Sequence, residues 1–220
     1  MLDRSLKKSN IDYPLFKIAL LGNSNVGKTS MVKCYEEKGI TSTSTPNTIG
    51  VDITTAECFL PDGRTLKYLV FDTAGSEKYK SMAYSIIRGT HGILLIYSVT
   101  DRESFNTVRR WVDDINQHLD NYVWFLIANK TDVPESQRVV SYNEGEQLAK
   151  SFGVMFFETS IYDKRPNHSL SIKEIMIKLG IMMLDNKVRQ NSKLSERILE
   201  SKLNLSDPTS TKEPKPGCRC

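Results

Sequence analysis

Short apolar segments alternate with segments of helical periodicity along most of this 220-residue chain. The apolar segments are "LFKIALLG" (15–22), "TLKYLVFD" (65–72), "GILLIYSV" (92–99), "VWFLIAN" (123–129) and "VMFFET" (154–159). They are too continuous to be half-exposed strands, so each predicts a strand that is buried on both faces. Strands that alternate with helices require crossover connections, which favour a mostly parallel sheet.

A sixth strand is predicted at the edge of this sheet. The segment "VDITTAECFL" (51–60) is joined to the strand at 65–72 by "PDGR", whose turn residues indicate an antiparallel hairpin. We therefore expect an α/β fold with a six-stranded, mostly parallel sheet, one antiparallel edge strand and helices on both faces. Ligands of such sheets bind beyond the carboxyl ends of the strands.

The helical segments carry their apolar residues on one face. The segment "GKTSMVKCYEEKG" (27–39) predicts a helix that ends at Gly39, and Ser141 with Glu144 predicts a capping box before a helix that contains Leu148 and Phe152. Two further apolar faces at helical spacing predict helices that pack on the core. The first face comprises Phe105, Val108, Trp111, Val112, Ile115 and Leu119, and the second comprises Ile172, Ile175, Met176, Leu179, Met182 and Met183.

The composition is that of a globular protein, with 39% hydrophobic and 25% charged residues. No apolar run reaches the length of about 18 residues that a membrane span needs, and the first ten residues lack the apolar core of a secretory signal, so we expect a cytosolic protein. Most of the net charge of +4 lies in residues 185–220, which hold eight Lys/Arg and five Asp/Glu. The remainder is nearly neutral and does not predict binding to nucleic acid.

The same patterns divide the chain into three predicted segments: an arm, a domain and a tail. Residues 14–184 form the expected domain, preceded by a flexible arm at 1–13. After about residue 185 the apolar periodicity decays, and "SDPTSTKEPKPGCRC" (206–220) is too polar and too rich in proline to form a core. We therefore expect residues 185–220 to be a flexible tail.

The first candidate site is a phosphate-binding loop. The sequence "GNSNVGKTS" (22–30) matches Gly-x4-Gly-Lys-Thr, follows a predicted strand and opens a predicted helix. Backbone N–H groups of such a loop surround phosphate oxygens, and Lys28 adds a charge at the outer phosphates, while the Thr29 hydroxyl is suited to Mg²⁺. The predicted nucleotide contacts are Gly22, Asn23, Ser24, Asn25, Val26, Gly27, Lys28, Thr29 and Ser30. The alternative is a glycine-rich helix cap that binds nothing.

The second candidate site selects the base. The sequence "NKTD" (129–132) ends a predicted strand, where the Asp132 carboxylate can accept both the ring N–H and the exocyclic amine of guanine. Asn129 can reach the other edge of the base, and the stem of Lys130 can cover its ring. Alone, this motif would be a plausible solvated turn, but behind a phosphate-binding loop and at the end of a strand it is not. The sequence "ETS" (158–160) would close the base pocket through Thr159 and Ser160, with Ile161 next to them.

The third candidate site binds the metal and the terminal phosphate. In "DTAG" (72–75), Asp72 is placed to hold Mg²⁺ through water, and the backbone of Gly75 to contact the last phosphate. Thr48, in the polar loop "ITSTSTPNT" (40–48), is suitably placed to complete the metal shell when that phosphate is present. Both loops are therefore predicted to depend on the ligand.

In this order, the motifs resemble those of the Ras superfamily of small GTPases over about Leu15 to Leu184. Within that superfamily, "TIGVDI", "DTAGSEKY", "IIRGTHGILLIYSVTDRESF" and the terminal "CRC" are similar to the Rab family. The resemblance implies a P-loop small GTPase fold and a GTP hydrolase that uses Mg²⁺ and switches between GTP and GDP in vesicle-mediated traffic. It implies catalytic roles for Lys28, Gly75 and Ser76.

The resemblance also implies partners. Effectors would bind the loops around Thr48 and Ser76 together with Ile53, Phe71 and Ile86, and further partners would be an exchange factor, a GTPase activator and an escort or GDP-dissociation inhibitor. The terminal Cys218 and Cys220 resemble a double geranylgeranylation site, which would hold the protein on the cytosolic face of an endomembrane, because two lipid chains anchor where one is marginal. A metal-binding cysteine pair is the alternative.

Ser76 departs from the family pattern, in which glutamine follows the Asp-x-x-Gly glycine and orients the attacking water. Because the serine side chain is shorter than that of glutamine, we expect slow intrinsic GTP hydrolysis and a long-lived GTP state. One alternative is a neutral change in a protein whose activator does the catalytic work. The other is a hydrolysis-deficient scaffold that stays bound to GTP. Ile40 stands where the family has an aromatic ring over guanine, which predicts faster nucleotide release. Ile161 and Tyr162 replace the usual Ala-Lys, and Asn25 replaces a usual glycine.

Overall fold

The fold is known from a computed structural model, which describes residues 14–36, 50–73, 88–162 and 171–204. Its centre is a six-stranded sheet with the order β2-β3-β1-β4-β5-β6. The strands are β1 (Leu15–Leu21), β2 (Val51–Phe59), β3 (Thr65–Thr73), β4 (Gly92–Ser98), β5 (Val123–Asn129) and β6 (Met155–Glu158). Among the described pairs, β2 with β3 is antiparallel and the rest are parallel, so the predicted fold class is confirmed.

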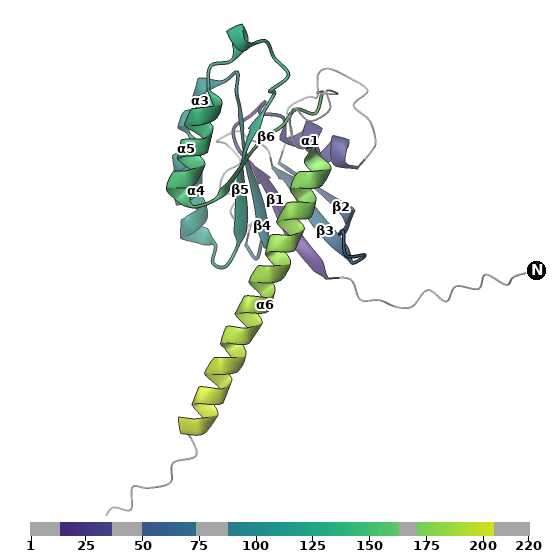
Figure 1. Ribbon diagram of the computed structural model, residues 1–220, viewed down its shortest axis with the longest axis vertical. Helices are drawn as coiled ribbons and strands as arrows, with labels where there is room; N and C mark the ends of the chain where they lie inside the picture. The colour runs from purple at the N-terminus through teal and green to yellow at the C-terminus, as the bar shows by residue number, and fades with distance from the viewer. Residues whose placement is uncertain (1–13, 37–49, 74–87, 163–170, 205–220) are drawn as a thin grey trace, which may run out of the picture. The chain divides into compact units, whose positions relative to one another are not determined.

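Helices cover both faces of this sheet, as predicted. They are α1 (Lys28–Tyr35), α3 (Arg102–Asn106), α4 (Val108–His118), α5 (Tyr142–Phe152) and α6 (Ile172–Asn204), with a 3-10 turn, η2 (Glu135–Gln137). Figure 1 shows α3, α4 and α5 grouped on one side of the sheet. The two core clusters agree with this arrangement, since α1 and the first turns of α6 contribute to one, and α4 and α5 to the other.

Strand β1 shows why the apolar segments are continuous. Phe16, Ile18 and Leu20 pack in the α1–α6 cluster, whereas Ala19 and Leu21 pack in the α4–α5 cluster. Successive side chains of a strand point to opposite faces, so a strand covered on both sides needs apolar residues on both of them. In β1 the five residues that enter the clusters are apolar, and Lys17 is half-buried between Phe16 and Ile18.

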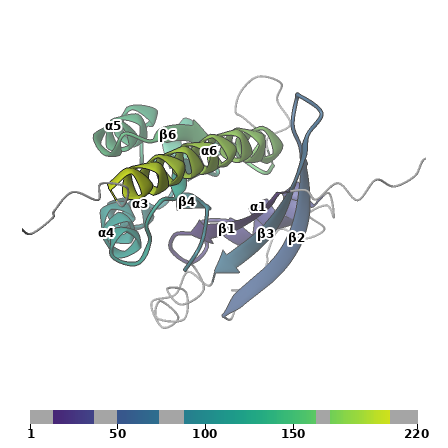
Figure 2. The ribbon, with the colours of Figure 1, turned by 90° about the horizontal axis from the view of Figure 1, so that it is seen from below.

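The β2–β3 hairpin lies at one edge of the sheet, where β2 is the edge strand (Figure 2). Its turn is closed by the backbone bond from Leu60 N–H to the Arg64 carbonyl at 2.8 Å. Gly63 has φ 86°, in the left-handed region that glycine adopts without strain. The predicted hairpin is therefore confirmed with its predicted turn residues.

Two predicted helical faces differ in detail from the structure. The face from Phe105 to Leu119 is divided at Thr107 into α3 and α4, and Asp101 caps α3 by accepting bonds from the N–H groups of Glu103 and Ser104. Met182, predicted on the core face of α6, is 36% exposed. At about 100° per residue, Met182 lies about 80° from the centre of the buried stripe, at the edge of the face.

Helix α6 extends to Asn204 and so continues into residues where the sequence analysis expects a flexible tail. Apolar periodicity reports burial rather than helicity, and residues 185–204 contain neither glycine nor proline and many good helix formers. The chain separates into two compact units, Met1–Leu184 and Asp185–Cys220. No helix in the described ranges has the length and apolar composition needed to cross a membrane.

The predicted capping box at the start of α5 is confirmed. Glu144 N–H donates to the Ser141 hydroxyl at 3.4 Å, and Ser141 N–H donates to the Glu144 carboxylate at 2.9 Å. Arg102 also donates to this carboxylate at 2.5 Å. The pKa of Glu144 is consequently lowered to about 2, first by Arg102 and then by the bonds from Ser141.

This lowered pKa makes the contribution of Glu144 to stability depend on acidity. A group whose pKa is lower in the folded than in the unfolded state stabilises above its unfolded pKa and loses that effect as the pH falls towards its folded pKa. Above about pH 4.5 we therefore expect the free energy of unfolding to be larger for the wild type than for the Glu144→Gln variant. This difference should shrink as the pH falls towards 2. Urea unfolding at a series of pH values measures it. A difference that stays constant over this range would contradict the assignment.

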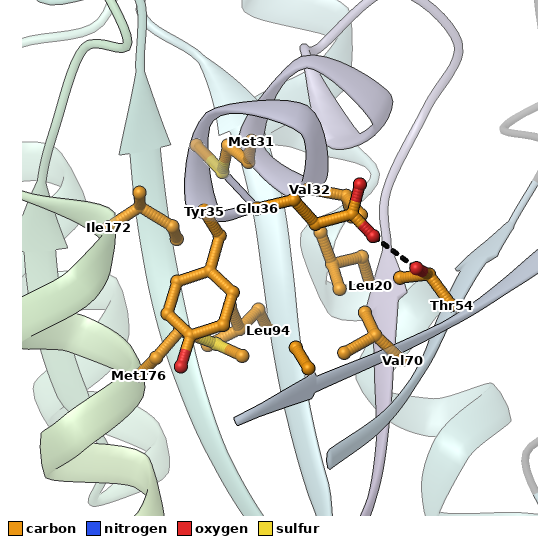
Figure 3. Close-up of a pocket in the computed structure, with 11 residues that line it drawn as sticks. Leu20, Met31, Val32, Tyr35, Glu36, Thr54, Val70, Leu94, Ile172 and Met176 are labelled. Atoms are coloured by element: carbon orange, nitrogen blue, oxygen red, sulfur yellow. Dashed lines mark hydrogen bonds between the residues drawn. The ribbon is translucent and has the colours of Figure 1, made fainter. Parts of the chain in front are cut away.

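The interior also holds a small apolar cavity between α1, the sheet and α6 (Figure 3). Its volume is about 10 Å³, and its lining includes Leu20, Met31 and Met176. The Thr54 hydroxyl donates to the Glu36 carboxylate at its rim (Figure 3). Such a volume accommodates about one water molecule, so the cavity is a packing gap and not a ligand site.

Candidate nucleotide-binding site

The three predicted motifs meet at one edge of the sheet. In the parallel register, Leu20 of β1 lies beside Asp72 of β3, and Ser98 of β4 lies beside Asn129 of β5. The carboxyl ends of β1, β3, β4 and β5 therefore share an edge, from which the phosphate loop, Asp72 and the "NKTD" segment extend.

The backbone of the phosphate loop explains its glycines. Gly22 has φ 137°, and a Cβ there would lie 2.1 Å from the carbonyl oxygen of Ile96. Gly27 has φ 100°, and a Cβ would lie 2.3 Å from the side-chain nitrogen of Asn129. Asn25, which replaces a usual glycine, has φ 61°. Asparagine is one of the few other residues that tolerate this left-handed conformation, so the substitution fits the loop.

Lys28 lies inside this loop with only 6% of its surface exposed. Its ammonium donates to the carbonyls of Gly22 at 2.8 Å and Asn23 at 2.7 Å. Burial lowers the pKa of Lys28 to about 8, against the opposing effect of Asp72. A buried cation that is bonded to neutral carbonyls is well suited to attract an anion such as phosphate.

Thr29 and Asp72 are adjacent, as a shared metal would require. The Thr29 hydroxyl donates to one Asp72 oxygen, while the other oxygen is buried without a hydrogen-bond partner among the described residues. Burial raises the pKa of Asp72, against the effects of the Thr29 bond and of Lys28. The described residues hold no group of three or more His, Cys, Asp or Glu side chains that could bind a metal. This donor set suits Mg²⁺, which keeps several waters and binds substrate phosphates with one or two protein ligands.

The base-selecting segment is fixed to both neighbouring loops. Asn129 is buried and donates to the Val26 carbonyl in the phosphate loop at 2.7 Å. The Ser160 hydroxyl donates to the Asp132 carboxylate and accepts a bond from Tyr162 N–H at 3.1 Å. Asp132 itself is exposed. Its carboxylate is thus oriented by Ser160 while it remains accessible to a ligand.

Other residues of this pocket are positioned by the backbone. Lys130 is half-buried with φ 66°, and burial lowers its pKa against the effects of Asp101 and Asp132. Thr159 is buried, and its N–H donates to the Ala128 carbonyl at 2.9 Å. Ile161 packs against the core, so we expect any contact with a base to come from its backbone.

Glu158 has a role that the sequence analysis did not predict. It forms an ion pair with Arg138, and the two side chains are only 18% and 13% exposed. This pair fixes the end of β6, one residue before Thr159. The spacing of 20 residues between the partners gives no signal in the sequence.

Several predicted residues lie outside the described ranges: Gly39, Ile40, Thr48, Gly75, Ser76, Ile86, Cys218 and Cys220. Two of the predicted effector positions lie within the described ranges. Ile53 is 54% exposed on β2, whereas Phe71 is buried on β3. The Lys17 ammonium lies 4.5 Å from the centre of the Phe71 ring.

The sheet order and the phosphate loop are those of P-loop GTPases, and residues 17–179 match the family model described as Ras family. The chain is 42% identical to Ras-related protein RABE1d of Arabidopsis thaliana over 156 residues, which are 70% of each chain. It is 34% identical to Ras-related protein Rab-3C of Bos taurus over 212 residues, covering 96% of this chain and 89% of that protein. The chain therefore belongs to the Rab family of small GTPases.

This membership has general consequences. Ras-family GTPases bind guanine nucleotides, generally with Mg²⁺. Rab-family members generally interact with effectors, exchange factors, GTPase activators and a GDP-dissociation inhibitor, and they are typically peripheral membrane proteins.

Proposed function

We propose that this protein is a GTP/GDP switch in vesicle-mediated membrane traffic, on the cytosolic face of an endomembrane. The observation that supports the nucleotide switch is the convergence of Lys28, the Thr29–Asp72 pair and Asp132 at one edge of the sheet. The role in membrane traffic is proposed from membership of the Rab family. Direct binding tests the nucleotide switch: purified protein with Mg²⁺ should bind GDP and GTP and discriminate against ATP. Equal affinity for ATP would contradict the proposal.

Each site residue has a separate task in this proposal. The loop from Gly22 to Ser30 surrounds the phosphates with N–H groups, and Lys28 neutralises their charge. Thr29, Thr48 and, through water, Asp72 would hold Mg²⁺, which adds charge neutralisation between the outer phosphates. Asn129, Lys130 and Asp132 recognise guanine, with Thr159, Ser160 and the backbone of Ile161 closing the pocket. Gly75 contacts the terminal phosphate.

Hydrolysis is the step in which this chain departs from its family. At Ser76, the hydroxyl is shorter than a glutamine side chain by about two bond lengths, so it cannot hold the attacking water at the same place. The water is then poorly oriented, and the protein stays longer in its GTP state. Effectors would recognise that state through the loops around Thr48 and Ser76, together with Ile53 and Ile86. Phe71, which is buried, would support this surface from below and not contact the effector directly.

Ser76→Gln is expected to accelerate single-turnover GTP hydrolysis by about 10- to 100-fold, because it restores a side chain that can orient water. The affinity for GDP should not change, since the introduced glutamine is expected to act on the attacking water and not on the base. Rapid-quench measurement of one turnover tests the effect. Hydrolysis by the wild type that is as fast as by the variant would show that serine is a neutral replacement.

A second candidate function also rests on Ser76: a scaffold that is almost always bound to GTP. The two functions differ in the nucleotide that the purified protein carries and in its response to an activator. A switch converts its bound GTP to GDP when an activator supplies the missing catalytic group, whereas a scaffold retains GTP under the same conditions.

Attachment to the membrane is proposed to require both terminal cysteines. One lipid chain binds a bilayer only marginally, whereas two chains anchor it, and Lys212, Lys215 and Arg219 add attraction to anionic lipid. We expect Cys218→Ser or Cys220→Ser alone to weaken membrane attachment strongly, and the double variant to abolish it. Cell fractionation with mass measurement of the C-terminal peptide tests this; an unlipidated peptide in a membrane-bound wild type would contradict it.

A further inference from the structure

The phosphate loop is connected to helix α4 through the side chain of Asn23. The side-chain carbonyl oxygen of Asn23 accepts a bond from the Trp111 indole N–H at 3.1 Å and another from the Thr107 hydroxyl at 2.9 Å. The single proton of this hydroxyl is shared with the Ser104 carbonyl, which lies slightly farther away at 3.1 Å. The backbone carbonyl of the same residue accepts the bond from the Lys28 ammonium at 2.7 Å. One residue therefore connects the helix to the lysine that faces the phosphates.

This connection is stronger than ordinary loop packing. An amide oxygen has two lone pairs, and both are used here by donors from one helical region. Trp111 is 3% exposed, and it packs in the α4–α5 cluster with Val108 and Ile115. Both bonds are partly buried, and the loss of either donor leaves one acceptor position of the amide oxygen without its partner. Asn23 is thus fixed relative to the core and not only relative to its own loop.

We propose that Thr107 and Trp111 are positioning residues for nucleotide binding. Through Asn23 they hold the Gly22–Asn23 backbone, and with it Lys28, in the arrangement that receives the phosphates. This inference rests on the proposed function, because it assigns a role in the binding of guanine nucleotide. Trp111 would act on the nucleotide through Asn23.

The expected effect follows from the fraction of loops that are competent to bind. Without the two donors, the loop samples additional conformations, so a smaller fraction of the molecules has the conformation that binds nucleotide. The apparent affinity for GDP falls in proportion to that fraction. The loss of one hydrogen bond of ordinary net strength raises a dissociation constant about fivefold, so the loss of both should raise the GDP dissociation constant about 10- to 30-fold.

The test compares the same substitution at the two tryptophans of the chain. Trp111→Phe keeps an aromatic ring but removes the N–H, and its GDP dissociation constant should rise about fivefold. Trp124→Phe is the matched control: Trp124 packs in the same cluster, against Phe152, near the start of β5 and away from the site. Its GDP affinity should equal that of the wild type.

A second pair of variants keeps the inference testable if Trp111→Phe folds poorly. Thr107→Val removes the donor while conserving shape, and Thr107→Ser retains the hydroxyl. We expect Thr107→Val to weaken GDP binding about fivefold and Thr107→Ser to restore it. In addition, Asn23→Ala should cost less affinity in a Trp111→Phe background than in the wild type, because the bond is already lost.

The outcomes separate the inference from the proposed function. A wild type that binds no guanine nucleotide contradicts the proposed function itself. A wild type that binds GDP, with Trp111→Phe and Trp124→Phe equal in affinity or with Thr107→Val and Thr107→Ser equally affected, contradicts the positioning role. Loss of thermal stability in Trp111→Phe without a change in the GDP dissociation constant would show a purely structural tryptophan.

Discussion

Asp132→Asn is expected to lower the affinity for GDP by about 10²- to 10⁴-fold, because two charge-assisted hydrogen bonds, each of about 1.5–3 kcal/mol, are replaced or lost. The carboxylate can accept from both the ring N–H and the exocyclic amine of guanine, whereas the amide of asparagine offers only one oxygen. Its NH₂ group then faces a donor on the base. The Ser160 hydroxyl can still donate to the remaining oxygen, so the loop should keep its fold.

The same change should improve the binding of xanthosine diphosphate relative to GDP. Xanthine carries a carbonyl where guanine carries the exocyclic amine, and this carbonyl accepts from the new amide. Asp120→Asn, at an exposed position beyond the end of α4, is the matched control and should leave both affinities unchanged. Competition binding with GDP and xanthosine diphosphate measures the ratio. An Asp132→Asn variant with the wild-type ratio would place base recognition elsewhere.

Local chemistry explains why much of the site could be predicted. Each motif is attached to a buried strand, and the carboxyl ends of parallel strands must share an edge, so Lys28, Asp72 and Asn129 are brought together once the strands are identified. The capping box of Ser141 and the hairpin turn at Gly63 are equally local, because their hydrogen bonds join residues at most four positions apart. Such features depend on short segments and are specified within them.

The parts that could not be predicted depend on contacts between distant segments. Asn23 is 88 residues from Trp111, whose helical spacing indicated only a core residue. Likewise, the division of this apolar face into α3 and α4 at Thr107 leaves the spacing of its apolar residues unchanged, so apolar periodicity does not report it. Apolar periodicity also does not report that α6 continues from Leu184 to Asn204, because a helix can continue without an apolar face when its residues have high helix propensity.

Lys28→Met is expected to weaken nucleotide binding strongly while changing the stability of the fold only slightly. The affinity for GDP and GTP should fall by about 10²- to 10³-fold, because the charge-assisted bonds of the ammonium to the outer phosphates are lost. Folding responds differently. Burial of the ammonium is unfavourable, as the lowered pKa of about 8 indicates, and methionine is an unbranched apolar residue of similar length. Against this gain, the carbonyls of Gly22 and Asn23 each lose a charge-assisted bond of about 1.5–3 kcal/mol.

The two effects on folding nearly cancel, so the nucleotide-free variant should match the wild type in unfolding free energy to within about 1–2 kcal/mol. Urea unfolding in EDTA and equilibrium nucleotide binding in Mg²⁺ measure the two quantities separately. Lys33→Met makes the same substitution at an exposed position of α1 and should change neither. If Lys28→Met instead lost stability and affinity together, the fall in affinity would reflect a disordered loop, and the direct role of the ammonium at the phosphates would be contradicted.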